Sequence, residues 1–155
     1  TKGEPTGLAK DFTDFILSAE GQAIVSKDYI AVNDGAAPYS GSKPSGKIVV
    51  GGSSSVGPVM EKLVEAYKEI NTGAEIELQV NDSTAGMTGA IDGNLDVGMA
   101  SRGLKDSEKA ELTSIIIAQD GIAVVINHNN PLEEVTMEQL KEIFNGSTTT
   151  WSELQ

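Results

Sequence analysis

Two short segments rich in glycine and hydroxyl side chains could bind a small anion. The first is GGSSSVGP at residues 51–58, and the second is NDSTAG at residues 81–86. Their hydroxyls belong to Ser53, Ser54, Ser55, Ser83 and Thr84. Glycine lets a ligand approach the backbone closely, and the unpaired N–H groups at a helix start favour negative charge. Each segment therefore predicts part of an oxyanion pocket, although serine and threonine most commonly serve only as helix caps.

A third segment, MASRGL at residues 99–104, adds Ser101 and Arg102. An arginine can hold a tetrahedral oxyanion through two parallel hydrogen bonds. A lone arginine is otherwise commonly solvated, so its ligand role depends on whether this segment lies beside the two serine-rich turns.

Other chemistries find little support in the sequence. Neither turn matches the P-loop pattern or G-x-G-x-x-G, which argues against nucleotide hydrolysis and dinucleotide binding. The chain has no cysteine, and its single histidine, His128, lies in the polar turn INHNNP. No carboxylate pair has a spacing that suggests acid–base catalysis. We therefore expect no enzyme, no metal site and no cofactor.

Composition narrows the possible partners. The 155 residues carry 11 Lys and Arg against 23 Asp and Glu, a net charge of −12. Nucleic acid and anionic membranes are therefore poor partners. No segment approaches the roughly 20 apolar residues that span a bilayer. No basic and apolar leader begins the chain, which indicates mature or excised material.

The elements that would position these segments alternate along the chain. Residues 1–32 predict two helices and a short strand, and residues 33–46 an exposed flexible connector that packs into no core. From Lys47 onward, strands at 47–51, 74–80, 95–99 and within 115–127 alternate with helices. A capping box at Thr136 and Gln139 begins the last helix. This order predicts one compact α/β domain of three layers with a mostly parallel sheet, whose ligands bind at the carboxyl ends of strands.

Four stretches in this order resemble phosphate-binding proteins of Pst-type ABC transporters. They are KIVVGGSSSVGPVMEKLVEAYKE, NDSTAG with DGNLDVGMASRGLKDSE, DGIAVVIN, and LKEIFNGSTTTWSEL, and together they span residues 47–155. PTGLAKDFTDFILSAEGQAIVSKDYI resembles the segment that ends such proteins, yet here it comes first. The resemblance implies a type II periplasmic-binding fold represented by lobe one alone, circularly permuted, with 33–46 at the junction. The second lobe and its Arg and Gly-Ser-Gly-Thr motif have no counterpart.

The resemblance also implies roles for individual residues. Ser55 and the backbone of Val56 would contact phosphate from the first turn, and Ser83 with Thr84 from the second, while Ser53 and Ser54 are weaker candidates. Arg102 stands at a ligand position of the family. In some members this position carries an acidic residue, and that residue accepts the proton of hydrogen phosphate. Asp82 is a possible substitute acceptor.

The parent proteins work outside the cytoplasmic membrane and dock on a membrane permease. Loss of one lobe would weaken phosphate binding to about the millimolar range. The alternative hypothesis is an engineered or isolated α/β scaffold that binds no ligand and dimerises through its exposed cleft face. The connector at the junction of two family segments favours engineering. A third alternative is an enzyme of flavodoxin-like topology. The strand-to-helix turns fit it, but no cofactor motif or catalytic set does.

Overall fold

The computed structural model describes residues 1–154, which form two compact units. The first unit runs from Thr1 to Gly121, and the second begins at Ile122. The sequence predicts one compact domain over the whole chain, whereas the described residues divide at Gly121. The division falls where the strands expected within residues 115–127 would have continued.

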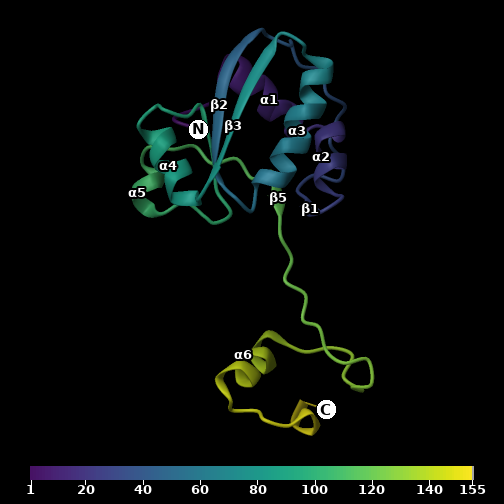
Figure 1. The fold of residues 1–155 in the computed structure, drawn as a ribbon. Coiled ribbons are helices and arrows are strands. Elements are labelled where there is room, and N and C mark those ends of the chain that lie inside the picture. Colours follow the sequence, from purple (N-terminus) through teal and green to yellow (C-terminus); the bar gives the residue numbers. More distant parts are fainter. Residues whose placement is uncertain (155) are drawn as a thin grey trace. The chain divides into compact units, whose positions relative to one another are not determined.

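A parallel three-stranded sheet forms the centre of the first unit (Figure 1). Its order is β3-β2-β4, and its strands are β2 (Gly46–Ser53), β3 (Ala74–Asn81) and β4 (Val97–Met99). The central β2 is buried from Val50 to Ser53, and strands covered on both faces carry continuous apolar runs. The predicted buried strand after Lys47 is thus confirmed.

Helices cover both faces of this sheet (Figure 1). One face carries α1 (Gly7–Leu17), α2 (Ala19–Val25) and α3 (Gly57–Ile70), and the other carries α4 (Ser83–Ile91). The main core lies between the first group and the sheet, and its most deeply buried members are Phe12, Val25, Val50, Val59, Leu63 and Tyr67. A smaller cluster under α4 contains Met87, Ala90 and Leu112. The predicted three-layer α/β fold with a parallel sheet is confirmed.

A close approach of backbones holds α4 against the sheet. Gly52 has a φ of +136°, and a Cβ atom there would overlap the carbonyl oxygen of Met99 and lie 3.0 Å from the Cα of Gly86. Only glycine fits a backbone of this conformation and spacing. The pair Gly52 and Gly86 therefore sets the distance between the end of β2 and the first turn of α4.

A second, antiparallel pair joins distant parts of the first unit. It consists of β1 (Ile30–Ala31) and β5 (Ala118–Gln119). The sequence predicted one or two strands within residues 115–127, but among the described residues only β5 forms there. One strand therefore forms and a second does not, because an apolar run becomes a strand only where a neighbouring strand pairs with its backbone.

The connector at residues 33–46 differs from its prediction. Tyr39 packs against the main core, with its ring 5.5 Å from that of Phe15. The buried carboxylate of Asp11 accepts hydrogen bonds from the hydroxyls of Tyr39 and Tyr67, the latter at 2.6 Å, and from the backbone N–H of Ser42 at 2.8 Å. The expectation of a segment without core packing is wrong because a single aromatic residue and one buried carboxylate suffice to attach it.

The second unit contains α6 (Met137–Asn145) and the short 3₁₀ helix η1 (Trp151–Leu154). The predicted capping box is confirmed: the Gln139 N–H donates to the Thr136 hydroxyl, and the Gln139 side chain accepts from the Thr136 N–H. Gly146 ends α6 in the left-handed conformation with φ +80°. Among the described residues, no helix is both long and apolar enough to cross a bilayer.

Candidate functional site

The carboxyl ends of the three parallel strands meet at one edge of the sheet. β2 ends at Ser53, β3 at Asn81 and β4 at Met99. Ser53 lies opposite Asn81, and Gly52 lies opposite Met99 in the strand register. The turns that follow are therefore neighbours, at the edge where open α/β sheets bind ligands.

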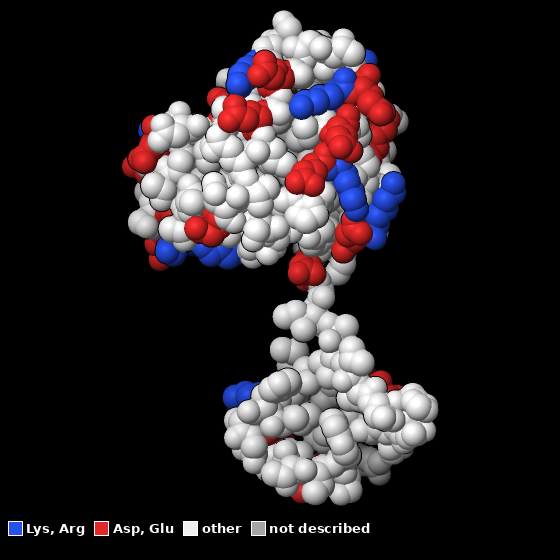
Figure 2. Space-filling view, viewed as in Figure 1, with Lys and Arg blue, Asp and Glu red and all other residues white. Residues whose placement is uncertain are grey.

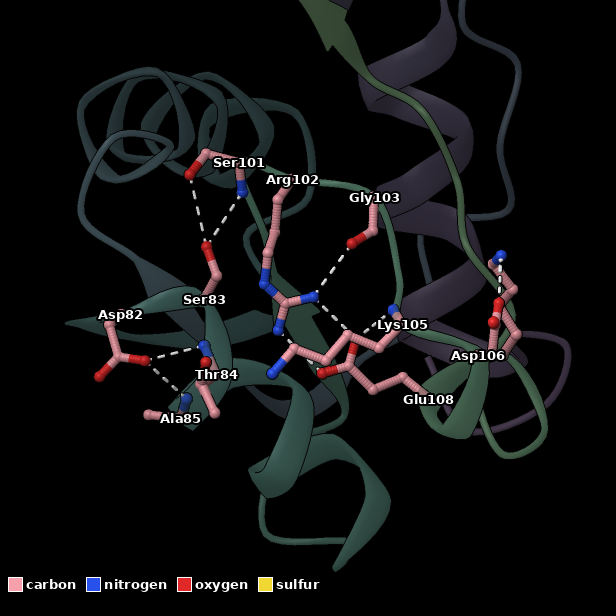
Figure 3. A network of polar contacts seen from close by, with 11 residues as sticks. Asp82, Ser83, Thr84, Ala85, Ser101, Arg102, Gly103, Lys105, Asp106 and Glu108 are labelled. Carbon is pink, nitrogen blue, oxygen red and sulfur yellow. Dashed lines mark hydrogen bonds and ion pairs between the residues drawn. The ribbon is translucent and has the colours of Figure 1, made fainter.

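Three serine hydroxyls from these three turns form one cluster. The Ser53 hydroxyl donates to the Ser101 hydroxyl at 3.0 Å. The Ser83 and Ser101 hydroxyls are 3.4 Å apart, and the Ser101 backbone N–H donates to the Ser83 hydroxyl at 3.2 Å (Figure 3). Since Ser53 is only 3% exposed while Ser101 is exposed, Ser53 supports the cluster from beneath. The structure thus brings together residues that lie 48 positions apart in the chain.

The first turn presents its remaining hydroxyls to solvent. Ser54 and Ser55 are exposed, and neither hydroxyl has a hydrogen-bond partner among the described residues. The carbonyl of Ser55 accepts a hydrogen bond from the Tyr29 hydroxyl at 2.7 Å, and this bond attaches the turn to the segment that follows α2. The Val56 backbone N–H, expected to contact a ligand, donates to the Ser53 carbonyl at 3.1 Å. That N–H would have to leave the turn to reach an anion.

The second turn is occupied by its own acidic residue. One oxygen of Asp82 accepts from the backbone N–H of Thr84 at 2.8 Å and of Ala85 at 2.9 Å (Figure 3). Asp82 is therefore the N-cap of α4, a use that any helix start favours. Its second oxygen accepts no hydrogen bond within the described part of the chain and stays available to a donor. The hydroxyl of Thr84 is exposed beside it.

Arg102 is held by a residue that the sequence analysis did not single out. Its guanidinium donates to both carboxylate oxygens of Glu108, each at 2.8 Å, and to the Gly103 carbonyl at 3.0 Å (Figure 3). The Arg102 side chain is 30% exposed, so it is neither fully buried nor freely solvated. Glu108 lies on the short helix α5 (Asp106–Lys109) and is buried.

Glu108 is ionised over the whole physiological pH range. Hydrogen bonds from Arg102 and from the Lys105 backbone N–H lower the pKa of Glu108 to about 2. The same contact with Glu108 raises the pKa of Arg102 above its usual value. The sequence signal that could have found Glu108 is its place in the first turn of a helix, three residues after Lys105, where an acidic side chain caps the backbone.

A cavity of about 470 Å³ opens beside this cluster within the first unit. Four of the predicted site residues line it: Ser55, Val56, Ser101 and Arg102. Apolar side chains such as Met60, Met99 and Leu112 line much of the rest, together with polar residues such as Gln119 and Asp120. The hydroxyls and the guanidinium thus share a cavity with many apolar side chains, and electrostatic interactions are stronger beside apolar surface than in water.

The nine predicted residues therefore separate into groups. Ser53, Ser83 and Ser101 are joined directly, and Arg102 follows Ser101 in the chain. Ser54, Ser55, Asp82 and Thr84 lie in the adjoining turns without a hydrogen bond to that cluster in the described residues. Val56 is bonded to it only through its backbone N–H, which donates to the Ser53 carbonyl. Within residues 1–154, no group of three or more metal-ligating side chains is present. The arrangement can offer neutral donors and one cation to a small anion.

Residues 37–155 match the family model of the PBP superfamily domain. The chain belongs to the PBP superfamily. It is 47% identical over 154 residues to the phosphate-binding protein PstS 2 of Streptococcus agalactiae serotype V, covering 99% of this chain and 53% of that protein. It is 41% identical over 149 residues to PstS 2 of Streptococcus pneumoniae serotype 4, covering 96% and 51%. The chain thus spans about half the length of these relatives.

Solved structures of the superfamily agree. A phosphate ABC transporter phosphate-binding protein from Streptococcus pneumoniae has a TM-score of 0.85 at 39% identity, covering 99% of this chain and 60% of that one. A putative phosphate ABC transporter substrate-binding protein from Clostridium perfringens, solved with bound phosphate, has a TM-score of 0.54 at 42% identity and covers 70% of this chain and 45% of that one. These comparisons confirm the resemblance to phosphate-binding proteins.

Proposed function

We propose that this chain binds inorganic phosphate and is the anion-contacting part of a phosphate receptor for ABC transport. The observation that carries the proposal is the convergence of the Ser53, Ser83 and Ser101 hydroxyls at one sheet edge, beside Arg102. The relatives' names as phosphate-binding proteins support the same ligand. One proposed set of ligand-binding residues follows: Ser53, Ser54, Ser55, Val56, Asp82, Ser83, Thr84, Ser101 and Arg102.

The proposed roles differ among these residues. Ser55, Ser83 and Ser101 donate hydroxyl hydrogens to phosphate oxygens, while the buried Ser53 orients Ser101. Arg102 supplies the positive charge through N–H groups not used by Glu108. The second oxygen of Asp82 accepts a hydrogen bond from the P–OH group of hydrogen phosphate, and Thr84 adds a hydroxyl beside it.

The overall charge makes such local donors necessary. A net charge of −12 repels an anion at long range. Figure 2 shows many acidic side chains beside basic ones on the α3 and β3 side of the first unit, and Lys47 there forms ion pairs with Glu75 and Glu77. Since Lys47 is paired and lies at the start of β2, whereas Ser53 lies at its end, it does not attract an anion to the site, and hydroxyls, amides and Arg102 supply the attraction there.

The partners follow from the same proposal. The full-length receptor docks on a membrane ABC permease and works outside the cytoplasmic membrane, as a binding protein and not an enzyme. A homodimer is a further proposal for the isolated chain, because large apolar side chains such as Ile116, 66% exposed, lie on its surface. Light scattering of the purified chain tests it.

The engineered-scaffold alternative is not favoured. Alignments that cover 96% to 99% of the chain in two streptococcal proteins run through both residues 1–32 and residues 47–155. Natural proteins therefore share this order of segments. Relative to other phosphate-binding proteins, a circular permutation remains our proposal for that order.

Titration calorimetry with inorganic phosphate tests the proposed function. We expect a dissociation constant on the order of millimolar, about −4 kcal/mol, because an open half-site lacks an opposing lobe. Sulfate titrated under the same conditions gives the selectivity that Asp82 provides. Absence of any phosphate heat at tens of millimolar would contradict the proposal, and submicromolar binding by a monomer would contradict the half-site.

A further inference from the structure

Arg102 has a special place in this chain because it is the only arginine among the 155 residues. It is also the only cation among the nine proposed ligand-binding residues. Whatever fixes its guanidinium therefore decides how the positive charge of the site is presented. Glu108 makes two of the three hydrogen bonds that hold that guanidinium.

The hydrogen bonds from Arg102 to Glu108 and Gly103, called the clamp below, leave part of the guanidinium free for a ligand. An arginine has five N–H donors. One nitrogen donates to Gly103 and Glu108, and the second to the other oxygen of Glu108, so three donors are used within the described residues. The remaining two, on Nε and on the second terminal nitrogen, match the bidentate geometry of an oxyanion.

Glu108 is itself held in place. Its side chain is 9% exposed, and one of its oxygens accepts the backbone N–H of Lys105 at 2.8 Å. The Leu112 N–H bonds to the Glu108 carbonyl at 2.8 Å and ties the backbone to the next turn. Because both the carboxylate and the backbone of Glu108 are held, Glu108 can keep the flexible Arg102 side chain in one rotamer.

We propose, on the basis of the proposed phosphate binding, that Glu108 is a positioning residue that aims the Arg102 guanidinium at the anion beside Ser83 and Ser101. It acts through Arg102 and does not touch the ligand. Fixing the arginine in advance spares the cost of immobilising it when the anion binds. This gain exceeds the repulsion between the Glu108 charge and the anion, because the carboxylate is already paired.

Simple electrostatics predicts the opposite result, which makes the proposal testable. Removal of a negative charge near an anion site should tighten anion binding. If positioning dominates, Glu108→Gln instead weakens it, since a glutamine places an NH₂ donor against the guanidinium and keeps only one acceptor. We expect phosphate to bind about three- to tenfold more weakly.

Amide NMR titration of the whole chain with inorganic phosphate measures this effect at millimolar affinity. Four proteins are compared: wild type, E108Q, R102K and the double variant. The matched control is Glu111→Gln, which removes an exposed carboxylate that makes no side-chain hydrogen bond in the described residues. E108Q should weaken binding in the wild-type background and change nothing in R102K, where the forked group is absent.

The single arginine also gives one Nε–H signal, which reports the clamp directly. In the wild type the terminal guanidinium protons should give separate signals, and in E108Q they should average. This readout decides the case if the double variant no longer binds. If E108Q fails to fold, Glu108→Asp replaces it, because the shorter acid keeps the charge and loses the bidentate contact.

Several outcomes would overturn the inference while the proposed function survives. They are E108Q binding phosphate as tightly as wild type or more tightly, an equal loss in the R102K background, and an unchanged guanidinium signal. Failure of the wild type to respond to phosphate at all would instead refute the proposed function, and the inference with it.

Discussion

The backbone N–H of Ser101 donates to the side-chain hydroxyl of Ser83 at 3.2 Å, although the two residues are 18 positions apart. This bond joins the turn after β4 to the first residue of α4. The Ser83 hydroxyl oxygen is the acceptor in this bond, so the bond does not use the Ser83 hydroxyl hydrogen. Two strand ends thus present a single, pre-arranged group of donors.

Ser83→Ala should weaken phosphate binding by about two- to tenfold, since a net hydrogen bond contributes about 0.5–1.5 kcal/mol. The same change removes the acceptor for the Ser101 N–H, so the two losses add. Titration of the variant with phosphate measures the effect. Ser107→Ala, which truncates an exposed serine on α5, is the control and should bind like wild type; equal affinity for Ser83→Ala and wild type would remove Ser83 from the site.

Gly52→Ala should destabilise the first unit by about 2 kcal/mol or more. The added methyl group would overlap the Met99 carbonyl oxygen and crowd Gly86, in a backbone conformation with φ +136°. Urea unfolding followed by circular dichroism gives the change in the free energy of unfolding. Gly103→Ala is the matched control, because nothing lies within 4 Å of a Cβ atom there. Similar stabilities for both variants would contradict the close packing of α4 on β2.

Asp11→Asn should cost about 2 kcal/mol at neutral pH, the scale of hydrogen bonds to a charged acceptor. Burial raises the pKa of Asp11, but the hydrogen bonds from Tyr39, Tyr67, Ser42 and Lys43 lower it by more, to below its ordinary value. Because the folded pKa is depressed, the stabilisation is complete above the unfolded pKa of about 3.9 and is lost as pH falls through the folded pKa. Urea unfolding at pH 7 and at pH 3 should show the wild type approaching the variant. A constant difference would contradict the assignment.

The same carboxylate should protect the connector from proteolysis. Burial, together with the hydrogen bond to Asp11, raises the pKa of Tyr67 to about 12, so this tyrosine remains a donor at all ordinary pH values. Chymotrypsin should cleave after Tyr39 slowly in the wild type and quickly in Asp11→Ala, as measured by the masses of the fragments. Asp14→Ala, which removes an exposed carboxylate paired with Lys10, is the control. Rapid cleavage of the wild type would instead support the original prediction that residues 33–46 are a flexible connector.

The sequence predicted the parts of this molecule that depend on local patterns. The apolar run after Lys47 predicted a buried strand, and Thr136 with Gln139 predicted a helix start, because each signal lies within a few residues. The position of the serine-rich turns at strand ends followed from the alternation of strands and helices. These rules need no knowledge of which residues meet across the fold.

What the sequence could not predict depends on contacts between distant segments. The attachment of the connector rests on Asp11 meeting Tyr39 and Tyr67, and neither spacing nor composition indicates that meeting. The capture of Arg102 by Glu108 required the short helix α5 to turn back on the end of β4. Of the one or two strands predicted within residues 115–127, only β5 forms among the described residues, because β1 pairs with it and local apolarity supplies no partner for the rest of the run.

Amide shift mapping with inorganic phosphate tests the central claim most directly. Addition of phosphate to the wild-type chain should shift the signals of Ser55, Ser83 and Ser101 together, with one dissociation constant in the millimolar range. Amides at the opposite end of the same sheet, such as those of the paired residues Lys47 and Glu75, should stay unchanged. Saturable shifts confined to other residues, or none at tens of millimolar phosphate, would contradict an anion site at the meeting point of the three turns.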